Sequence, residues 1–482
     1  MAKIQLTRPI VVTFQPLKRL APEKIVVFSF AAFIFLMTLV LMLPQCSTRG
    51  PIGFIDALFM ITSATCVTGL APIDPGTHLT TFGQIVLLIS IQLGGIGIMT
   101  FSTFLLYIFA GRLSLRDSTL LSQTFGSTRS TSPRGLLWTV IGISLMIETI
   151  GALLLYSRFE RDLPMNEAIW FSVFHSISAF CNAGFSLFPD NLERYLGNGT
   201  VNFTIMGLII LGGIGFIAFL ELFQFLRSRS RLFLEKMKLV RGSSYWREAP
   251  YRFSVHSRIV IRTSLILILV GAVLIGLLEY NNVQAGMSWI ERIYSSLFQS
   301  VTPRTAGFNT LNIGAMSGAT LFVIMLLMFI GASPGSCGGG IKTSTFAVLM
   351  GIVRSRLRRQ EHVIFFERRV SPFVQSEAVT FTILATMIVI AGALLLQIFE
   401  TGGVGHRASG EKFVELLFEA ISAFGTVGLS TGVTPKLAPL SKLTLVLLMF
   451  VGRVGPLTLA LAISRSRPAS RITYPEGRVV IG

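Results

Sequence analysis

The chain repeats one pattern four times, and this repetition limits its fold more strongly than any other feature of the sequence. Each copy has a long apolar run, a shorter apolar segment that ends in a glycine followed by a bulky apolar residue, and a second long apolar run. The four glycines are separated by 115, 123 and 121 residues, and they are Gly69, Gly184, Gly307 and Gly428. Spacing this regular predicts four structural units of one kind.

The long runs have the length of membrane-spanning helices. They lie before the glycines at about residues 25–43, 136–157, 263–279 and 378–399, and after them at about 82–110, 203–226, 319–353 and 440–464. A bilayer core of roughly 30 Å needs about 20 helical residues, so the segments of about 10–14 residues before each glycine are typical of re-entrant helices. The sequence predicts an all-α polytopic membrane protein with four outer-helix, re-entrant pore-helix and inner-helix repeats, eight spanning helices in total, around one pseudo-fourfold pore.

Composition and charge distribution agree with this interpretation. Apolar residues make up 52% of the chain and charged residues only 13%, whereas a soluble protein carries about 25% charged residues. The segments between repeats and at the two ends hold 29 Lys and Arg against 7 acids, and the rest holds 12 against 16. This asymmetry predicts that both termini are cytoplasmic, and it explains the net charge of +18 without a nucleic acid. The four cysteines form no CxxC pair and are expected to be free, buried thiols.

The same patterns give the expected boundaries of the chain's parts. The four repeats are predicted at 25–110, 135–226, 263–353 and 375–464, the third with a broken inner helix. The cytoplasmic parts are predicted to be a basic N-terminal segment, two short loops, a basic loop and a C-terminal tail, at 1–24, 111–134, 354–374, 227–262 and 465–482.

The four glycine-containing loops are the candidate site. Non-helical backbone at membrane depth is tolerated only where protein buries it or where it lines a water-filled path. Half-helices that point their negative C-terminal ends at a common axis favour a cation there. Extended backbone then offers carbonyl oxygens in place of hydration water, and glycine permits dihedral angles closed to other residues. Such a ring suits a large, weakly hydrated cation such as K+.

Two other classes of function have less support. None of the five histidines lies in an HExxH pattern, and no Ser/His/Asp or phosphate-loop motif is present, so we predict no catalytic residues and no enzyme. The stretch 338–343 ends in Lys-Thr but lacks the spacing of a phosphate loop. The alternative is an alternating-access Na+ or K+/Na+ cation transporter. Inverted repeats would favour it, but the four repeats all enter the membrane from the same side.

The four units resemble the Trk/Ktr/HKT superfamily of K+ transporters. The likeness covers the chain from about residue 20 to its end, and the lack of an extra N-terminal helix pair favours the KtrB type over the TrkH type. The resemblance implies the membrane subunit of a K+ uptake system with K+ bound at a selectivity filter. The matching filter residues are Val67, Thr68, Gly69, Asn182, Ala183, Gly184, Thr305, Ala306, Gly307, Thr426, Val427 and Gly428.

The resemblance also implies a gate beneath the filter. One proline and five glycines within residues 331–340 exclude an ordinary helix in the third inner run. In the family a loop at this place closes the path, and an arginine matching Arg453 contacts it. Arg453 could instead pair with Glu148 or Glu221, and Lys342 could be an anchor or a second gate element. The expected gate residues are Gly331, Ala332, Ser333, Pro334, Gly335, Ser336, Gly338, Gly339, Gly340, Lys342 and Arg453.

Partners and location follow from the same resemblance. It implies a multi-pass protein of the cell membrane that forms a homodimer on a cytoplasmic ring of RCK (KTN) subunits similar to KtrA and TrkA. K+ is then the transported ion, no organic cofactor binds this chain, and ATP/ADP or NAD(H) binds the partner. The basic loop 227–262 offers a docking surface, although anionic lipid would also explain its charge. Selectivity for K+ over Na+ and activation by Na+ are left open.

Several polar residues have alternative interpretations. We expect the side chain of Arg304, just before the third filter, to point away from the path. The carboxylate of Asp56 is expected to interact with the helix dipole at the N-terminus of the first half-helix, and not to bind an ion. Glu148, Glu221 and Glu419 are expected to bond the backbone or to join helices. The glycine clusters at 94–97 and 212–215 are expected to let helices approach closely.

Overall fold

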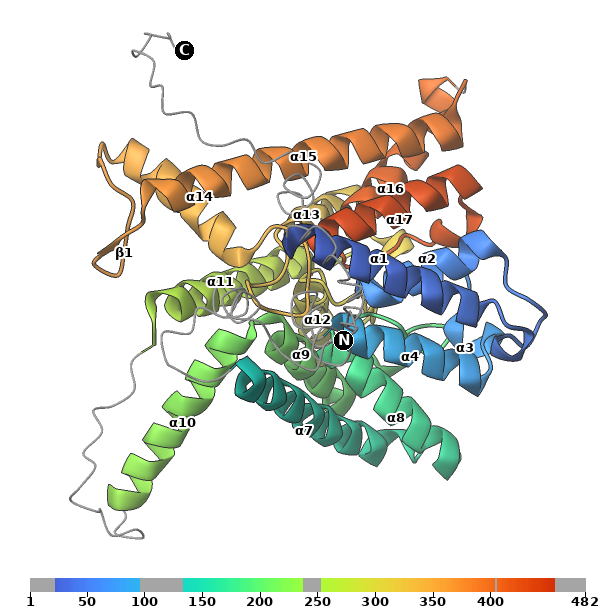
Figure 1. Cartoon of the computed structure of the whole chain (residues 1–482), viewed down its shortest axis with the longest axis horizontal. Helices are drawn as coiled ribbons and strands as arrows, with labels where there is room; N and C mark the ends of the chain where they lie inside the picture. The colour runs from blue at the N-terminus through green and yellow to red at the C-terminus, as the bar shows by residue number, and fades with distance from the viewer. Residues whose placement is uncertain (1–21, 96–132, 237–252, 404, 456–482) are drawn as a thin grey trace, which may run out of the picture.

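The computed structural model describes residues 22–95, 133–236, 253–403 and 405–455, and these are mostly helical. In Figure 1 the blue, green, yellow-green and orange-red segments follow one another around the centre of the molecule. The predicted first inner helix beyond Gly95, most of the loop 111–134, much of the loop 227–262, most of the N-terminal segment 1–24 and the tail 465–482 lie outside the described residues.

The first two repeats each begin with an outer helix and a shorter pore helix. In the first repeat these are α1 and α2, followed by the short α3 and the inner helix α4, with the bounds Pro22–Leu41, Phe54–Thr65, Pro75–His78 and Thr81–Gly95. In the second repeat they are α7 and α8, followed by α9 and α10, with the bounds Pro133–Phe159, Met165–Phe180, Gly199–Gly213 and Phe216–Lys236.

The last two repeats have the same order. The third contains α11, α12, α13 and α14, with the bounds Val255–Leu278, Trp289–Val301, Gly318–Phe329 and Thr343–Leu357. A hairpin of β1 (Ile364–Phe365) and β2 (Arg368–Arg369) then leads to the fourth repeat. That repeat contains α15, α16 and α17, with the bounds Pro372–Thr401, His406–Gly425 and Pro439–Val454. The pore helices α8 and α16 have 16 and 20 residues. They exceed the predicted 10–14 because their first turns are polar and precede the apolar segments.

Serine side chains begin four of the helices. Ser254, Ser288, Ser317 and Ser371 precede α11, α12, α13 and α15, and each accepts a hydrogen bond from the backbone N–H three residues later. These bonds satisfy N–H groups that the helix itself leaves without an acceptor. At Ser288 the side chain of Glu291 also accepts from the serine N–H, which completes a capping box.

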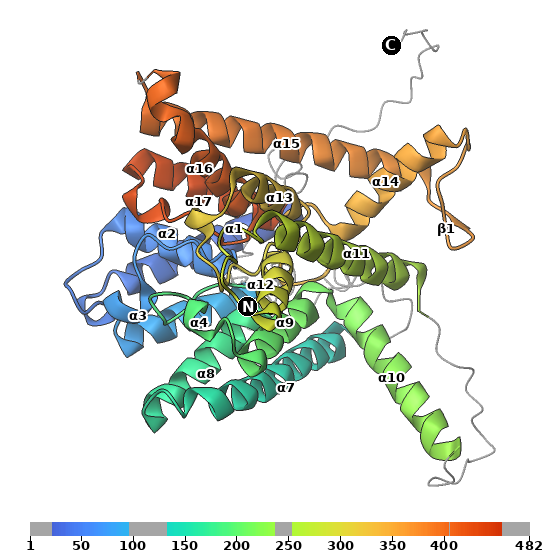
Figure 2. The ribbon, with the colours of Figure 1, turned by 180° about the vertical axis from the view of Figure 1, so that it is seen from behind.

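Neighbouring repeats pack in a cycle. The inner helix of each repeat contacts the pore helix of the next, through the pairs α4 with α8, α9 with α12, α13 with α16, and α17 with α2. The last pair returns to the first repeat, so the four units close into a ring. Figure 2 shows the same order from behind, with the long helices α15 and α7 on opposite outer sides.

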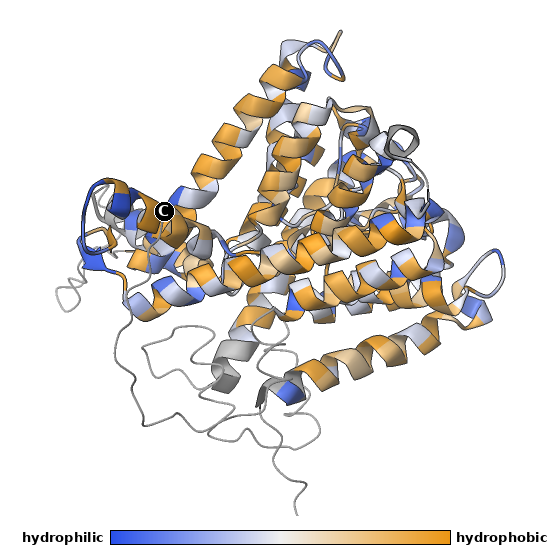
Figure 3. Ribbon diagram, turned by 90° about the horizontal axis from the view of Figure 1, so that it is seen from above, coloured by the Kyte–Doolittle hydropathy of each residue, from blue (hydrophilic) through white to orange (hydrophobic). Residues whose placement is uncertain are grey.

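The apolar surface agrees with a membrane protein. Three described helices have the length and hydropathy of a membrane span, Trp138–Phe159, Val255–Leu278 and Pro372–Thr401. The helices are hydrophobic along most of their length in Figure 3, and hydrophilic residues gather at their ends and in loops. Many large side chains on the outer helices are exposed, as expected where lipid surrounds them.

The second inner helix differs from the sequence prediction. The sequence predicts one spanning helix over the run 203–226, but the structure divides this run into α9 and α10, with a bend of 112° between them. Gly215 lies at the bend with a φ of +90°, a value that glycine adopts without the steric cost of a side chain. The glycines at 212–215 therefore break a helix, in addition to allowing close packing.

In three repeats, a glycine of the inner helix packs directly against the C-terminal end of the pore helix of the same repeat. A Cβ atom on Gly94, Gly212 or Gly452 would collide with the backbone carbonyl of Thr65, Phe180 or Phe424, respectively. Each of these carbonyls belongs to the residue four positions before the filter glycine of its repeat. This repeated contact sets the distance between the inner helices and the filter.

The contact at Gly212 predicts that alanine substitutions at two glycines of α9 change the free energy of unfolding in opposite directions. Gly212→Ala should lower the free energy of unfolding by about 1–3 kcal/mol, because a methyl group has no room there. Gly207→Ala is the matched control, since a Cβ atom at Gly207 meets nothing within 4 Å and alanine is favoured in helices by about 1 kcal/mol. Thermal unfolding of the purified variants in detergent measures both effects. A Gly212→Ala variant as stable as Gly207→Ala would contradict the packing described.

Candidate functional site

The four filter segments share an unusual backbone conformation. Two residues before each glycine, a residue other than glycine has a positive φ: Val67, Asn182, Thr305 and Thr426, at 58°, 60°, 69° and 50°. The filter glycines also have positive φ, between 68° and 99°. For β-branched residues this conformation is a genuine outlier, and such residues gather where function requires a particular backbone geometry.

The filter glycines form a closed ring at the centre of the molecule. A Cβ atom on Gly69 would lie 2.5 Å from the carbonyl oxygen of Ala183, one on Gly184 would lie 2.7 Å from that of Ala306, and one on Gly307 would lie 2.6 Å from that of Val427. A Cβ atom on Gly428 would collide with the carbonyl of Thr68 in the first repeat. Each glycine therefore packs on the next repeat, and the structure brings all four predicted filter segments together.

A hydroxyl group at the end of each pore helix fixes the filter backbone. Ser63 and Ser422 accept hydrogen bonds from the N–H groups of Gly69 and Gly428, at 3.0 and 3.1 Å. In the other two repeats the hydroxyl donates to the carbonyl after the glycine: Ser178 to Phe185 at 2.9 Å and Thr302 to Phe308 at 2.5 Å. The third hydroxyl lies five residues before its glycine instead of six, so the third filter is one residue shorter.

Two charged side chains near the filter are bonded to side chains of other helices. The guanidinium of Arg304 is buried and donates to the hydroxyl of Ser264 on the outer helix α11, at 2.8 Å. The side chain of Asp56, in the first turn of α2, forms an ion pair with Lys442 of α17 at 2.7 Å. Asp56 therefore occupies the helix end where a negative charge is favourable and also joins the fourth repeat to the first.

The interrupted third inner helix forms the predicted intramembrane loop between α13 and α14. Ile330 and Ile341 pair as a parallel bridge at its base, and the hydroxyls of Ser333 and Thr343 lie 3.0 Å apart. The N–H groups of Ser333 and Cys337 donate to the carbonyls of Gly213 and Gly212, at 3.0 and 3.2 Å. A third bond joins Phe216 to Gly335 at 3.1 Å. The bend between α9 and α10 thus supplies hydrogen-bond partners for a loop at membrane depth.

The tip of this loop lies directly against two filter segments. A Cβ atom on Gly338 would collide with the hydroxyl of Thr305, and one on Gly339 would lie 2.5 Å from the hydroxyl of Thr426. The N–H of Gly339 also donates to the Thr426 hydroxyl at 2.9 Å. The loop therefore contacts the filter in the third and fourth repeats, where the side chains of both threonines are fully buried.

Two cations hold the loop in place. The guanidinium of Arg453 on α17 donates to the carbonyls of Cys337 in the loop and Gly94 on α4. The ammonium of Lys342 donates to the carbonyl of Gly338, within the same loop, at 2.6 Å. Arg453 thus bridges the loop to the first repeat, and in this structure its described partners are carbonyls rather than Glu148 or Glu221.

The three acids considered from the sequence have neutral partners in the described structure. Glu148 accepts from the side-chain amide of Gln92 at 3.1 and 3.2 Å, and Glu221 accepts from the N–H of Ser254 at 2.9 Å. Glu419 accepts hydrogen bonds from the hydroxyls of Ser430 and Thr434, which both follow the fourth filter. All four cysteines are free and buried, as predicted.

Sequence reasoning missed the acceptors that support the loop. The carbonyls of Gly94, Gly212 and Gly213 belong to glycine clusters that were interpreted only as helix-packing positions. Their glycine content was the available signal, because glycine also marks helix breaks. No sequence signal indicated the left-handed conformation at Val67 or Thr305, since β-branched residues normally avoid it.

The closed ring of re-entrant loops, with an intramembrane loop against it, defines a multi-pass membrane transport protein. The sequence matches the model of the TrkH family of cation transport proteins over residues 14–473, and the chain belongs to that family.

Proteins of known name are similar over nearly their whole length. The chain is 36% identical to Ktr system potassium uptake protein B of Bacillus subtilis, covering 96% of this chain and 97% of that protein. It is 30% identical to the potassium/sodium uptake protein NtpJ of Enterococcus hirae, covering 96% and 98%. The crystal structure of the potassium transporter TrkH from Vibrio parahaemolyticus has the same fold, with a TM-score of 0.66, 18% identity, and coverage of 94% and 86%.

The bonds of Arg453 predict how exposed the loop cysteine is. In a variant that keeps only Cys337, Arg453→Gln should raise the rate of labelling by a membrane-permeant maleimide about tenfold or more, because two charge-assisted bonds that hold the loop are lost. Arg304→Gln is the control, since it removes another intramembrane guanidinium, one that bonds Ser264 on α11 and not the loop. Equal labelling rates in the Arg453 variant and the parent would show that the guanidinium does not hold the loop.

Proposed function

We propose that this chain is the membrane subunit of a K+ uptake system and conducts K+ in single file through the ring of four filter segments. The observation that carries the proposal is the closed ring, in which each filter glycine packs on a backbone carbonyl of the next repeat. The names of two relatives, from Bacillus subtilis and Vibrio alginolyticus, support K+ as the ion, since both are called Ktr system potassium uptake protein B.

The chemistry of the ring suits a monovalent cation. The filter residues before each glycine are Thr68, Ala183, Ala306 and Val427, and their side chains are fully buried. They bring no carboxylate or imidazole, so backbone oxygens are the groups available to replace the hydration shell of an ion. The pore helices α2, α8, α12 and α16 end beside these segments, and their C-terminal ends add negative potential.

The loop at residues 331–342 would act as the gate. Its tip lies against Thr305 and Thr426, beneath the filter, and Arg453 ties it to the first repeat. Ion passage would then require the loop to leave this position, which breaks the bonds of Arg453 and the bond from Gly339 to Thr426. Contact with two filter segments would couple gate opening to the filter.

The finer organisation belongs to the same proposal. Eight spanning helices with cytoplasmic termini would follow the boundaries given from the sequence, and the cyclic packing of the four repeats supports one path per subunit. A homodimer on a cytoplasmic ring of RCK subunits would regulate the path, with ATP/ADP or NAD(H) bound by the ring. The Ktr system names of relatives support a multi-component system. Alternating access has less support, because the repeats pack in one rotational order rather than as inverted halves.

The ring predicts a loss of selectivity when a filter glycine gains a side chain. Gly307→Ala should lower the ratio of K+ to Na+ flux about tenfold or more, which corresponds to roughly 1.4 kcal/mol, because its methyl group would displace the carbonyl of Val427. Gly307→Asp should abolish K+ flux. Fluxes of K+, Rb+ and Na+ into liposomes that contain the purified protein provide the measurement.

Gly286→Ala is the matched control for this experiment. Gly286 has a φ of +78°, close to the +79° of Gly307, but a Cβ atom there meets nothing within 4 Å. Both variants therefore carry the same backbone cost, and only one disturbs the ring. A wild-type flux ratio in Gly307→Ala, with normal folding, would overturn the proposed function.

The gate predicts that shortening the loop within residues 332–340 raises the flux of K+. A shorter loop cannot reach Thr305 and Thr426 from its fixed ends at α13 and α14, so the path beneath the filter would stay open. Initial rates of Rb+ uptake into liposomes test this, with thermal unfolding as the check on folding. A well-folded variant with unchanged or reduced flux would rule out the loop as the gate.

A further inference from the structure

Each pore helix carries one side chain at an equivalent position behind its filter. Met60, His175 and Glu419 lie nine residues before their glycines, and Gln299 lies eight before its glycine because the third filter is one residue shorter. All four side chains are fully buried. Three of them are polar, although they lie within the protein at membrane depth, where a polar group needs a hydrogen-bond partner.

The three polar side chains bond the chain that leaves the filter. Nε2 of His175 lies 2.9 Å from the hydroxyl of Ser186, which is the second residue after Gly184. Glu419 bonds the hydroxyl of Ser430, again the second residue after its glycine. With its amide turned so that the oxygen faces them, Gln299 accepts from the N–H groups of Thr310 and Leu311, at 3.2 and 3.1 Å, the third and fourth residues after Gly307. In three repeats a polar side chain of the pore helix therefore bonds the segment that leaves the filter.

The hydrogen bonds of His175 define its role. Nδ1 lies 2.7 Å from the carbonyl of Phe171, which can only accept, so Nδ1 carries the hydrogen. Nε2 of the neutral ring is then an acceptor, and it receives bonds from the Ser186 hydroxyl and, at 3.4 Å, from the N–H of Leu187. A side chain with an acceptor at this point serves both donors, and it lies closer to the Ser186 hydroxyl than the carbonyl of Asn191 does, at 2.9 against 3.4 Å.

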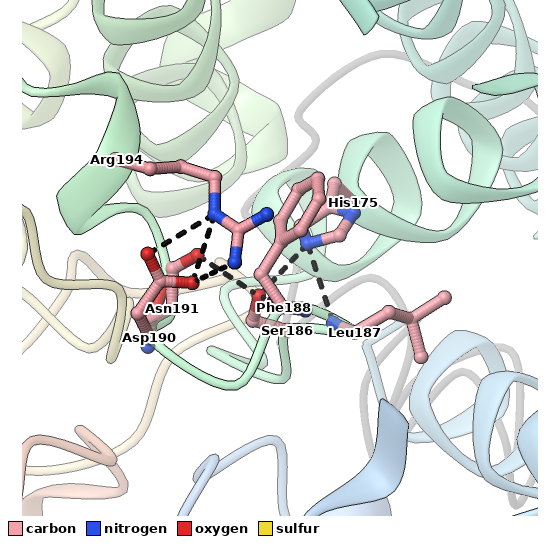
Figure 4. A network of polar contacts seen from close by, with 7 residues as sticks. All are labelled: His175, Ser186, Leu187, Phe188, Asp190, Asn191 and Arg194. Carbon is pink, nitrogen blue, oxygen red and sulfur yellow. Dashed lines mark hydrogen bonds and ion pairs between the residues drawn. The ribbon is translucent and has the colours of Figure 1, made fainter. Parts of the chain in front are cut away.

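The segment held by His175 is itself well connected, as Figure 4 shows. The Ser186 hydroxyl accepts from the N–H of Phe188 at 3.0 Å and lies 3.4 Å from the carbonyl of Asn191. The ion pair of Asp190 and Arg194, at 2.6 Å, follows within the same loop. His175 therefore links the pore helix to a compact loop through Ser186, the second residue after the filter glycine.

We propose that His175 is a positioning residue of the second filter and helps to set the preference for K+ over Na+. Its acceptor holds Ser186 and Leu187 outward, which fixes the width of the ring at Gly184. Without this acceptor the segment is free to relax toward the axis, where it fits the smaller ion better. Gln299 and Glu419 have the same role in the third and fourth repeats. This inference rests on the proposed function, because it concerns the selectivity of that same filter.

The chain itself supplies the variants for the test. His175→Met introduces the residue of the first repeat, which has similar bulk and no strong acceptor. His175→Gln introduces the residue of the third repeat, whose amide oxygen keeps the acceptor. Purified variants in liposomes give the ratio of Rb+ to Na+ flux, and thermal unfolding in detergent gives their stability.

We expect His175→Met to lower the ratio of Rb+ to Na+ flux about tenfold, a change that matches the free-energy cost of leaving a buried hydrogen bond unmade. We expect His175→Gln to keep the ratio within about twofold of the wild type. A merely structural role would change stability without changing this ratio. A wild-type ratio in His175→Met, or an equal loss in both variants, would overturn the inference.

Ser186→Ala keeps the test decisive if His175→Met does not fold. Removal of the Ser186 hydroxyl eliminates the closer of the two bonds to Nε2, so the ratio should fall in the same direction, and a wild-type ratio would again contradict the inference. The wild-type protein separates the two proposals. If it carries no K+ or Rb+, the proposed function fails, whereas a selective wild type with an equally selective His175→Met variant refutes only the role of His175.

Discussion

Backbone polar groups at membrane depth need partners within the protein, and this requirement organises the whole structure. The four filter segments leave helical geometry inside the molecule, so the pore-helix carbonyls accept hydrogen bonds only from N–H groups that precede each filter glycine. Hydroxyl groups at the pore-helix ends bond some of their backbone groups. The glycines let each segment pack on the carbonyl of the next repeat. A ring of this kind is complete only with four members, which explains why the chain carries the pattern four times.

The same requirement connects the filter to the interrupted inner helix. The loop between α13 and α14 takes its partners from the bend at Gly215, from Arg453 and from Thr426. The second and fourth repeats therefore support the backbone of a loop that belongs to the third. An arginine at membrane depth is costly unless it is bonded, and the bonds of Arg453 to two carbonyls join the loop to the first repeat. The proposed gate is thus held by contacts that a conformational change can exchange.

Much of the architecture could be predicted because it depends on length and period. The filter glycines, their flanking helices and the loop around Pro334 follow from apolar runs and from the helix penalties of glycine and proline. The bend at Gly215 could not be predicted, because a glycine cluster in an apolar run also suits close helix packing. The partners of Arg453 and the left-handed conformation of Val67 depend on contacts between repeats. The role of His175 depends on its bond to Ser186, which no sequence pattern indicates.

In the proposed function, the four glycine loops surround one dehydrated monovalent cation. Crystals of the protein soaked with Tl+, which replaces K+ and scatters anomalously, would test this directly. We expect an anomalous peak on the axis enclosed by Gly69, Gly184, Gly307 and Gly428, at a distance from backbone oxygens that excludes an intervening water. Ordered Tl+ found only outside this ring, with the axis free of anomalous signal, would contradict it.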